Sequence, residues 1–288
     1  MKQAILDSIG IFLLRKGFTI KSMTRTCFDI VAKSTGAILL IKVLEDANSV
    51  KKDFTDEMHR IGSYINASPI IISEKAGNSL ENNVVYSRFG IYTLNLETFK
   101  KCINHQFPFV KRTQAGLTAS IIGNKLKDRR EKEGYSTNNL AKKLGVSNRM
   151  ISRYENNNAE IRIEKAIRLY NIFGDEIFDK INIFGSEKEI YENCKSKISK
   201  KYSDLGFKTM ETKKVPFDII SKKDKEVIVT GIGDKTSPKF KPLSKLLDVD
   251  NLIIFKKKKP KGIPSLTKEE FMEFEKSNEL VKFLKEFD

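Results

Sequence analysis

The feature that most constrains the fold of this chain is an internal repeat that places two related segments at its two ends. The stretch GFTIKSMTRTCFDIVAK, which begins at Gly17, aligns without a gap on GFKTMETKKVPFDIISK, which begins at Gly206. A second match in the same order joins GIYTLNLETF from Gly90 to GIPSLTKEEF from Gly262. Two matches in one order are hard to explain by chance, so we expect both ends of the chain to adopt the same fold.

The spacing of apolar residues predicts the elements of the repeated unit. Each copy is expected to open with an amphipathic helix. The residues on its apolar face are Ile5, Ile9 and Leu13 in the first copy and Ile190, Cys194, Ile198 and Tyr202 in the second. In the first copy we expect strands near 18–24, 27–33 and 37–43, a helix near 50–65, the strands SPIIIS and IYTL, and a helix from Asn95. The order α-β-β-β-α-β-β-α is typical of an α/β sandwich around a mixed sheet.

The two copies differ in length between their matched stretches. The first runs from Gly17 to Gly90, whereas the second runs only from Gly206 to Gly262 and is therefore the shorter. The shortfall falls mainly on EKAGNSLENNVVYSR, whose Gly, Asn and Ser content predicts a surface loop and hairpin. In the second copy the basic run KKKKPKG replaces this hairpin, and it is either a solvated loop or a contact to DNA backbone.

The residues between the copies have a different character. HQFPFVKRTQAG is typical of a connector, LTASII of a short strand, and every segment from Asn124 to about Phe184 has helical period. We therefore expect an α/β domain at 1–104, a connector and helical domain at 105–184, and a second, shortened α/β domain at 185–288. The fold class is α/β with one all-α domain in the middle.

The helical part carries the most specific motif of the chain. Ser136 and Ser147 are good N-cap residues, and Gly145 permits a sharp turn between the two helices that they open. From Ser136 to Glu155 the residues meet the pattern S-x-x-x-L-A-x-x-L-G-V-S-x-x-x-I-S-x-x-E. This pattern closely resembles the lambda-repressor-like (XRE or Cro/CI) helix-turn-helix family. Where that family frequently has Gln, this chain has Thr137, so that one phosphate contact is not carried over by identity.

The second helix of such a motif presents its exposed N-terminal end to the major groove. Asn pairs bidentately with adenine and Arg with guanine, each worth about 1–3 kcal/mol of discrimination. The candidate base-reading residues are Ser147, Asn148, Arg149, Ser152 and Arg153. The candidate DNA-backbone contacts are Lys125, Arg129, Ser136, Thr137, Lys142 and Lys143.

The distribution of charge supports nucleic acid as the partner. The whole chain has 53 Lys and Arg against 37 Asp and Glu, a net charge of +16. From Lys111 to Glu155 there are 11 basic and 4 acidic residues, so this short stretch alone contributes +7. The alternative is that the basic residues form a solvated face and that the helix-turn-helix binds only protein.

The first copy also raises the question of a nuclease. Restriction-endonuclease-like enzymes hold a metal with at least two carboxylates and position water with a Lys, in an Asp and (D/E)-x-K signature. Here Asp29 is present, but the tripeptide is Leu40-Ile41-Lys42, so the second carboxylate is missing. In the second copy Asp218 is kept, and with a one-residue gap the matching positions are Ile228 and Thr230. We expect a catalytically degenerate core without metal or cofactor.

Two further points qualify the prediction of degenerate sites. Asp29 and Asp218 are expected to bond backbone amides or a basic neighbour at a strand start. Glu45 and Asp46, just beyond the strand, stay open as migrated metal ligands. Neither of the two histidines, His59 and His105, lies in a cluster with metal-ligand spacing.

The cysteines and the longest apolar runs bear on where the chain works. Its three cysteines lie far apart without a C-x-x-C pair, so the sequence predicts neither a disulfide framework nor a zinc site. No apolar run approaches the ~20 residues of a membrane span. We therefore expect a cytoplasmic protein.

The order of domains resembles a family of archaeal HTH-type transcriptional regulatory proteins, through F-D-I-V-A, L-L-I-K-V and A-S-P in the first part and the helix-turn-helix after it. The resemblance implies a regulator that reads double-stranded DNA sequence-specifically. We expect a homodimer, with the flanking domains serving dimerisation or partner binding, and the sequence identifies no small-molecule effector. The alternatives are a metal-dependent nuclease or DNA-junction-processing enzyme, and an adaptor that binds only protein.

Overall fold

The computed structural model of the chain describes residues 2–23, 25–184, 190–235 and 237–287. By the density of contacts, the chain separates into two compact units. Unit 1 holds the residues up to Ile72, then Phe89–Ile91, and those from Phe184 onward, whereas unit 2 holds Ser73–Arg88 and Tyr92–Ile183. The division into 1–104, 105–184 and 185–288 remains a prediction, and its second boundary adjoins residues 185–189, which lie outside the described residues.

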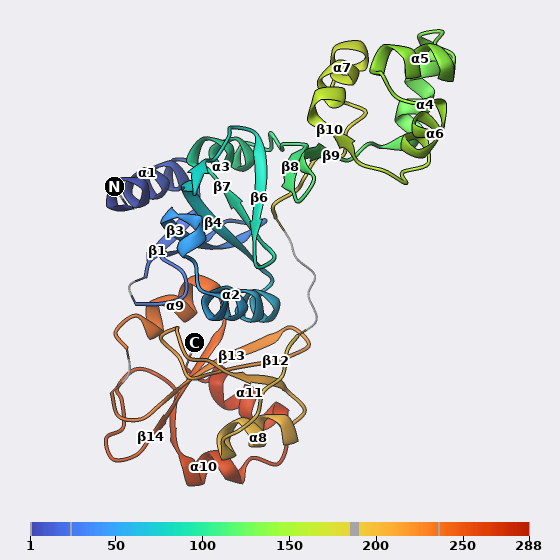
Figure 1. Cartoon of the computed structure of the whole chain (residues 1–288). Coiled ribbons are helices and arrows are strands. Elements are labelled where there is room, and N and C mark those ends of the chain that lie inside the picture. Colours follow the sequence, from blue (N-terminus) through green and yellow to red (C-terminus); the bar gives the residue numbers. More distant parts are fainter. Residues whose placement is uncertain (1, 24, 185–189, 236, 288) are drawn as a thin grey trace. The chain divides into compact units, whose positions relative to one another are not determined.

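The N-terminal part of unit 1 is a sheet covered by helices (Figure 1). Its elements are α1 (Lys2–Arg15), β1 (Thr19–Ser22), β2 (Ile30–Lys33), β3 (Ile38–Asp46), the 3-10 turn η1 (Ala47–Ser49), α2 (Lys52–Ile65) and the first part of β4 (Ala67–Ala76), which passes into unit 2 at Ser73. The strand order is β1-β2-β3-β4, with the first three antiparallel. The predicted apolar face of α1 is confirmed, because Ile5, Ile9 and Leu13 are all buried.

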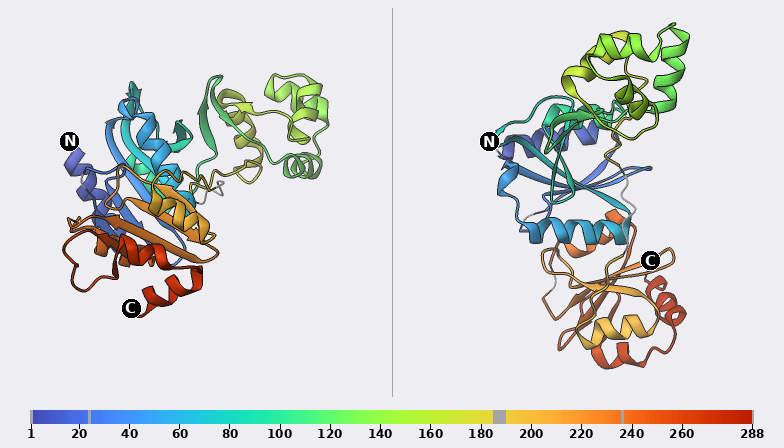
Figure 2. Two further views of the ribbon diagram at one scale, coloured as in Figure 1. Left: turned by 90° about the horizontal axis from the view of Figure 1, so that it is seen from below. Right: turned by 45° about the vertical axis from the view of Figure 1, so that its right-hand side comes forward.

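The C-terminal part of unit 1 repeats this order of elements. They are α8 (Lys197–Asp204), β11 (Lys208–Glu211), β12 (Ile219–Lys223), β13 (Glu226–Ile232), α9 (Phe240–Leu247), β14 (Asp250–Phe255), β15 (Ser265–Thr267), α10 (Lys268–Glu273) and α11 (Ser277–Lys285). The sheet is mixed: β11, β12 and β13 run antiparallel, and β13, β14 and β15 run parallel. Helices α8, α10 and α11 share one apolar cluster on one face of the sheet, and α9 lies on the other face (Figures 1 and 2).

The predicted start of the second opening helix is wrong. Helix α8 begins at Lys197, so Ile190 and Cys194 lie before it in an extended segment. Two contacts from β11 hold this segment: Asn193 forms a β-bridge with Met210, and the Glu211 carboxylate accepts the N–H of Ser196 at 2.6 Å. Apolar spacing alone could not reveal these tertiary contacts.

The strand registers place the two parts in correspondence without insertion or deletion from the first strand to the third. In the first part, Asp29 N–H donates to the Ile41 carbonyl at 2.7 Å; in the second, Asp218 N–H donates to the Thr230 carbonyl at 2.8 Å. The one-residue gap assumed from the sequence is therefore wrong. The residues that correspond to Leu40 and Lys42 are Val229 and Gly231, in place of Ile228 and Thr230.

Within unit 1 the two parts contact each other through corresponding residues. Lys33 at the end of β2 forms an ion pair with Asp248, and its counterpart Lys222 in β12 donates to Asn66 Oδ1 at 3.3 Å. Asn66 and Asp248 are themselves counterparts, because each ends the helix after the third strand in the left-handed conformation, with a φ of 52°. Reciprocal contacts of this kind are the mark of a two-fold, isologous interface.

The helices after the third strands and the main chain add further contacts between the two parts. Helix α2 contacts β12, and helix α9 contacts β1. The two corresponding β-β loops also meet, since Cys27 N–H donates to the Lys214 carbonyl at 2.9 Å. The two parts of unit 1 thus pair with one another as two subunits of a homodimer would.

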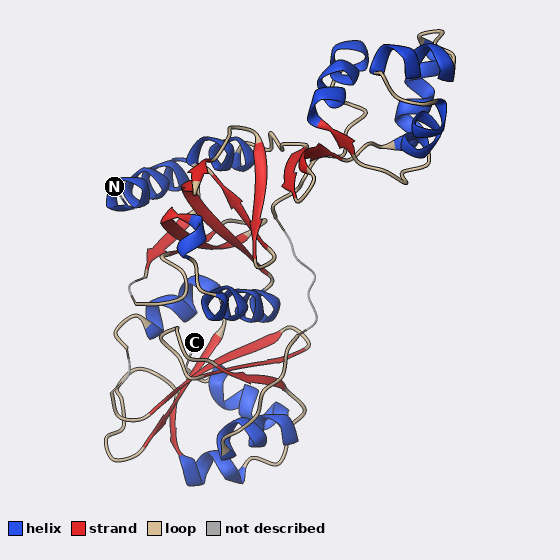
Figure 3. Ribbon diagram, viewed as in Figure 1, coloured by secondary structure: helices blue, strands red, loops and turns tan. Residues whose placement is uncertain are grey.

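Unit 2 combines the end of the first α/β segment with a helical bundle (Figure 3). Its elements are β5 (Asn78–Ser79), β6 (Val84–Arg88), most of β7 (Ile91–Leu94), α3 (Leu96–Ile103), β8 (Val110–Thr113), β9 (Gly116–Ala119), α4 (Gly123–Lys132), α5 (Thr137–Leu144), α6 (Asn148–Glu155), β10 (Ile161–Arg162) and α7 (Ile163–Phe173). The predicted hairpin is confirmed, because β5 pairs antiparallel with the end of β4.

Two sequence predictions for unit 2 require correction. The expected connector contains β8, which pairs parallel to β6 through Val84 and Val110 and antiparallel to β9. The segment from Asn124 to Phe184 is not helical throughout, because β10 pairs with β9 and no helix follows Phe173 among its described residues. The bundle therefore joins the α/β segment through a strand.

Candidate nucleic-acid interface

The helix-turn-helix is built by the local signals that its sequence carries. The Ser136 hydroxyl accepts the N–H of Asn139 at 3.1 Å, and the Ser147 hydroxyl accepts the N–H of Met150 at 3.3 Å. These contacts satisfy amides in the first turns of α5 and α6 that have no partner within the helix. Gly145, with a φ of 67°, ends α5 in the left-handed conformation and allows the turn. The predicted caps and turn are confirmed.

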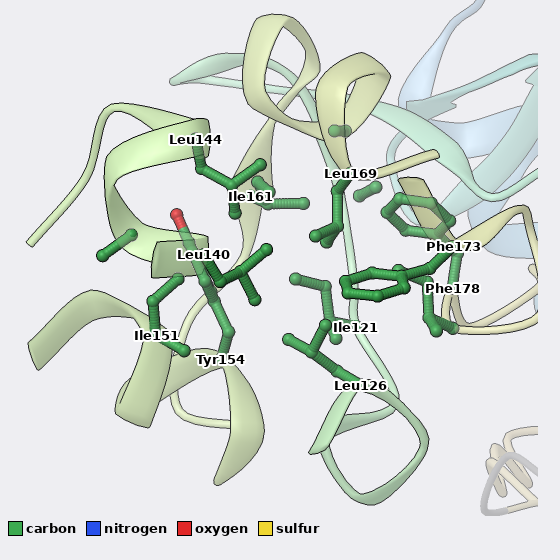
Figure 4. Close-up of a cluster of buried hydrophobic side chains, with 14 residues drawn as sticks. Ile121, Leu126, Leu140, Leu144, Ile151, Tyr154, Ile161, Leu169, Phe173 and Phe178 are labelled. Atoms are coloured by element: carbon green, nitrogen blue, oxygen red, sulfur yellow. The ribbon is translucent and has the colours of Figure 1, made fainter. Parts of the chain in front are cut away.

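One face of each helix enters a common apolar core (Figure 4). Leu140 and Leu144 from α5 and Ile151 from α6 are completely buried, and Tyr154 is nearly so. Burial of an aliphatic side chain of this size stabilises a fold by about 1.5–3 kcal/mol. The core fixes α6 by its inner face and leaves its other face to solvent.

A largely buried ion pair joins α4 to α6. The Arg130 guanidinium donates to both carboxylate oxygens of Glu155, at 2.5 and 3.2 Å, and to the Tyr135 carbonyl at 3.1 Å. The hydrogen bond to Glu155 raises the pKa of Arg130. At Gly123, a Cβ atom would lie 2.0 Å from the Glu155 carbonyl oxygen, so only glycine fits there. Arg130 was counted from the sequence only as a positive charge, although its position four residues after buried Leu126 indicates an inward-facing side chain.

The predicted base-reading residues lie on the exposed face of α6. Asn148 and Arg149, in its first turn, and Ser152, one turn later, are exposed. Arg153 is exposed too, but its guanidinium donates to the Asn158 carbonyl at 3.2 Å, toward the end of the helix. The first turn therefore offers an amide and a guanidinium at consecutive exposed positions, and these groups pair with adenine and guanine edges.

The candidate backbone contacts divide into two groups. Arg129 forms an ion pair with Glu176, and Lys143 donates to the Tyr135 hydroxyl at 2.9 Å. Lys125 and Lys142 are exposed, and neither forms an ion pair within the part of the chain that the structure describes. Ser136 and Thr137 are exposed at the start of α5, where helix N-terminal amides favour phosphate.

The carboxylate of Asp29 is fully engaged in the first α/β segment. Its Oδ2 accepts the N–H of Val43 at 2.8 Å, and its Oδ1 lies 3.0 Å from the ammonium of Lys2 and 3.5 Å from that of Lys42. Burial lowers the pKa of Lys42, and the neighbouring Asp29 opposes that shift. Leu40, at the position of the second metal ligand, is completely buried.

In the second segment, Asp218 forms the same contact with a main-chain amide, but β13 has no lysine at the position of Lys42. Its Oδ2 accepts the N–H of Ile232 at 2.6 Å, and Gly231 stands where the first segment has Lys42. The predicted role of both carboxylates in bonding backbone amides is confirmed.

The other candidate ligands of the first segment are used elsewhere or exposed. Asp46 accepts the N–H of Asn48 at 2.9 Å and so caps η1, whereas Glu45 is exposed. His59 Nε2 lies 3.1 Å from the Phe89 carbonyl oxygen. Among the described residues, no three His, Cys, Asp or Glu side chains lie close enough to hold one metal ion. Likewise, no helix in the described ranges is long and apolar enough to cross a membrane.

Comparison with known proteins finds matches for both the first α/β segment and the helix-turn-helix. Residues 2–108 match the PD-(D/E)XK superfamily domain, and residues 126–174 match a helix-turn-helix family. A protein of Methanocaldococcus jannaschii is 30% identical, with 98% of this chain and 96% of that protein covered. One of Thermococcus gammatolerans is 27% identical, with 98% and 96% covered. Both are named "Putative HTH-type transcriptional regulatory protein". No solved structure matches the chain.

Proposed function

The chain belongs to the family of archaeal HTH-type transcriptional regulatory proteins, and from that premise we propose that it reads a specific double-stranded DNA sequence with the first turn of α6. The observation that carries the proposal is the placement of Asn148 and Arg149 on the solvent face of a helix whose other face is locked into the core by Ile151 and Tyr154. A rigid helix with base-pairing groups at its exposed end suits entry into the major groove.

We further propose that the segments on either side of the bundle are two copies of one restriction-endonuclease-like fold without catalysis. They form a scaffold by pairing with each other, as Lys33 and Lys222 do with Asp248 and Asn66. The matching registers of their first three strands support this origin from one fold. On this proposal the chain has three domains, at 1–104, 105–184 and 185–288. We also propose that the protein binds its DNA in the cytoplasm.

Specific binding is proposed to require a homodimer. A single helix-turn-helix reads only a few base pairs, and two units spaced by about 34 Å give an operator its affinity. Because the reciprocal face of each α/β segment is used inside the chain, a second chain must dock through another surface. Sedimentation of the protein with and without its selected duplex tests this point: a monomer at micromolar concentration that stays monomeric on DNA contradicts it.

Two substitutions in the bundle test DNA reading. Arg149→Ala is expected to relax base preference at one position by about 1–3 kcal/mol, because it removes a bidentate donor. Lys142→Ala is expected to weaken binding to all duplexes alike and to lower the salt slope by about 1. Binding that is absent or insensitive to salt would support the adaptor instead.

The match of residues 2–108 to a PD-(D/E)XK domain keeps a nuclease as the second candidate function. It is tested by incubation with linear and branched DNA in the presence of Mg²⁺ or Mn²⁺. If the protein cleaves DNA and Asp29→Ala abolishes the cleavage, the protein is a nuclease and the proposed regulatory function is wrong. Since Asp29 holds the Val43 amide, Asp29→Asn, which keeps an acceptor, serves as the variant least disturbing to the fold.

A further inference from the structure

The C-terminal α/β segment carries a concentrated cationic loop between β14 and β15. Residues 256–261 include five lysines, at 256, 257, 258, 259 and 261, and all five are exposed. Lys241, from α9, joins them, because its ammonium donates to the Gly262 carbonyl at 2.5 Å. This lysine loop occupies the place in the fold where the first segment has β5 and β6, between β4 and β7.

A carboxylate holds the backbone of the lysine loop. Asp234 Oδ1 accepts the N–H groups of Lys256, Lys257 and Lys258, at 2.8, 2.9 and 3.3 Å. These bonds lower the pKa of Asp234, with that from Lys257 the strongest cause. Asp234 therefore uses its charge on main-chain amides, and none of the three ammonium groups forms an ion pair in the described part of the chain. The lysine side chains are held apart from internal partners and directed to solvent.

We propose that the lysine loop is a second DNA-contacting surface, which binds the phosphate backbone without reading sequence. The proposal rests on the function proposed above, because DNA is the polyanion that such a regulator meets. Lysine contacts to phosphate release condensed counterions, so each one adds about 0.9 to the slope of log binding constant against log salt concentration. A loop with a fixed backbone loses less conformational entropy on binding than a mobile one.

The test compares two triple variants of the full-length protein on a duplex that lacks the selected consensus. Lys256→Gln, Lys257→Gln and Lys258→Gln together are expected to lower the salt slope by roughly 2–3. The matched control is Lys195→Gln, Lys197→Gln and Lys200→Gln, which removes three exposed lysines from the same segment. The control is expected to leave the slope near that of the unmodified protein. Equal slopes for the two triples, or an unchanged slope in the loop triple, would overturn the proposal.

A pair of substitutions at Asp234 tests whether the fixed backbone matters. Asp234→Ala makes the protein more positive but releases the three amides, so we expect weaker binding than for Asp234→Asn, which has the same charge and keeps an acceptor. Equal or tighter binding by Asp234→Ala would contradict a preorganised loop.

The outcomes separate this inference from the proposed function. If the unmodified protein selects a sequence and Arg149→Ala relaxes it while the loop triple changes nothing, only the lysine-loop proposal fails. If the unmodified protein binds no duplex, the proposed function fails as well.

Discussion

The two α/β segments of this protein differ where a nuclease would have its chemistry and agree where the sheet needs support. Asp29 and Asp218 make the same contact, each accepting an amide from the end of the third strand, at 2.8 and 2.6 Å. Yet Asp29 has Lys42 beside it, whereas Gly231 takes that position in the second segment. Asp218 is present although the second segment has neither a second carboxylate nor the Lys. Its contact with the Ile232 amide is enough to explain its presence. Asp29 therefore needs no catalytic role to account for its presence.

The segments also differ at the position of the hairpin. In the first, β6 pairs with β8, the strand through which the chain continues toward the helix-turn-helix. In the second, the lysine loop stands in the place of β5 and β6, and β15 follows directly. The same position of the fold therefore carries different structures in the two segments. In the first it attaches the helical bundle, and in the second it forms a cationic surface.

The largest effect is expected when the missing carboxylate is put back. Leu40→Glu and Val229→Glu each place a carboxylate at a buried position, at a cost of about 3–5 kcal/mol in the free energy of unfolding. Val229→Glu should cost more, because Gly231 supplies no cation whereas Lys42 lies two residues from Leu40 on the same strand face. Chemical denaturation measures both. A stable Leu40→Glu protein that cleaves DNA with Mg²⁺ would break the comparison.

The next effect separates the two carboxylates that the segments share. Asp29→Ala should lower the free energy of unfolding by about 2–3 kcal/mol, because it leaves both an amide and the half-buried Lys42 without their anion. Asp218→Ala should cost only about 1 kcal/mol, since Asp218 is exposed and loses one amide contact. Urea titrations of both variants give the difference. Equal losses would show that the Lys42 pair contributes nothing.

The smallest effect concerns the reciprocal interface. Lys33→Ala and Lys222→Ala should each cost less than about 1 kcal/mol, because Asp248 is 80% exposed and Asn66 is neutral. Only the Lys33 loss should shrink as salt is added, since only that contact is ionic. Thermal unfolding at low and high salt tests this contrast. A salt-dependent loss in Lys222→Ala would disprove the assignment of partners.

Local signals explain what the sequence predicted well. The helix-turn-helix is defined by caps at Ser136 and Ser147, a left-handed Gly145 and apolar residues at helical spacing, all of which act within a few residues of one another. The strands of the first segment were placed by their apolar runs for the same reason. In the structure Ser136 and Ser147 cap their helices, and the apolar residues at helical spacing are buried, as the motif predicts.

Long-range contacts explain what the sequence did not predict. Ile190 and Cys194 have helical spacing, but contacts with Met210 and Glu211 in β11 keep their segment extended. The pairing of β8 with β6 and the reciprocal contacts within unit 1 join residues far apart in the chain, which periodicity cannot detect. The ion pair of Arg130 with Glu155 likewise joins residues 25 positions apart, so its partner could not be read from the periodicity.

The most direct test of the central claim is selection of bound sequences from a random duplex pool by the unmodified protein. The account predicts one consensus made of two inverted half-sites about one helical turn apart. In Arg149→Ala, the preference for one base of each half-site should be lost. A pool that yields no consensus, or a consensus that Arg149→Ala leaves unchanged, would contradict DNA reading by α6.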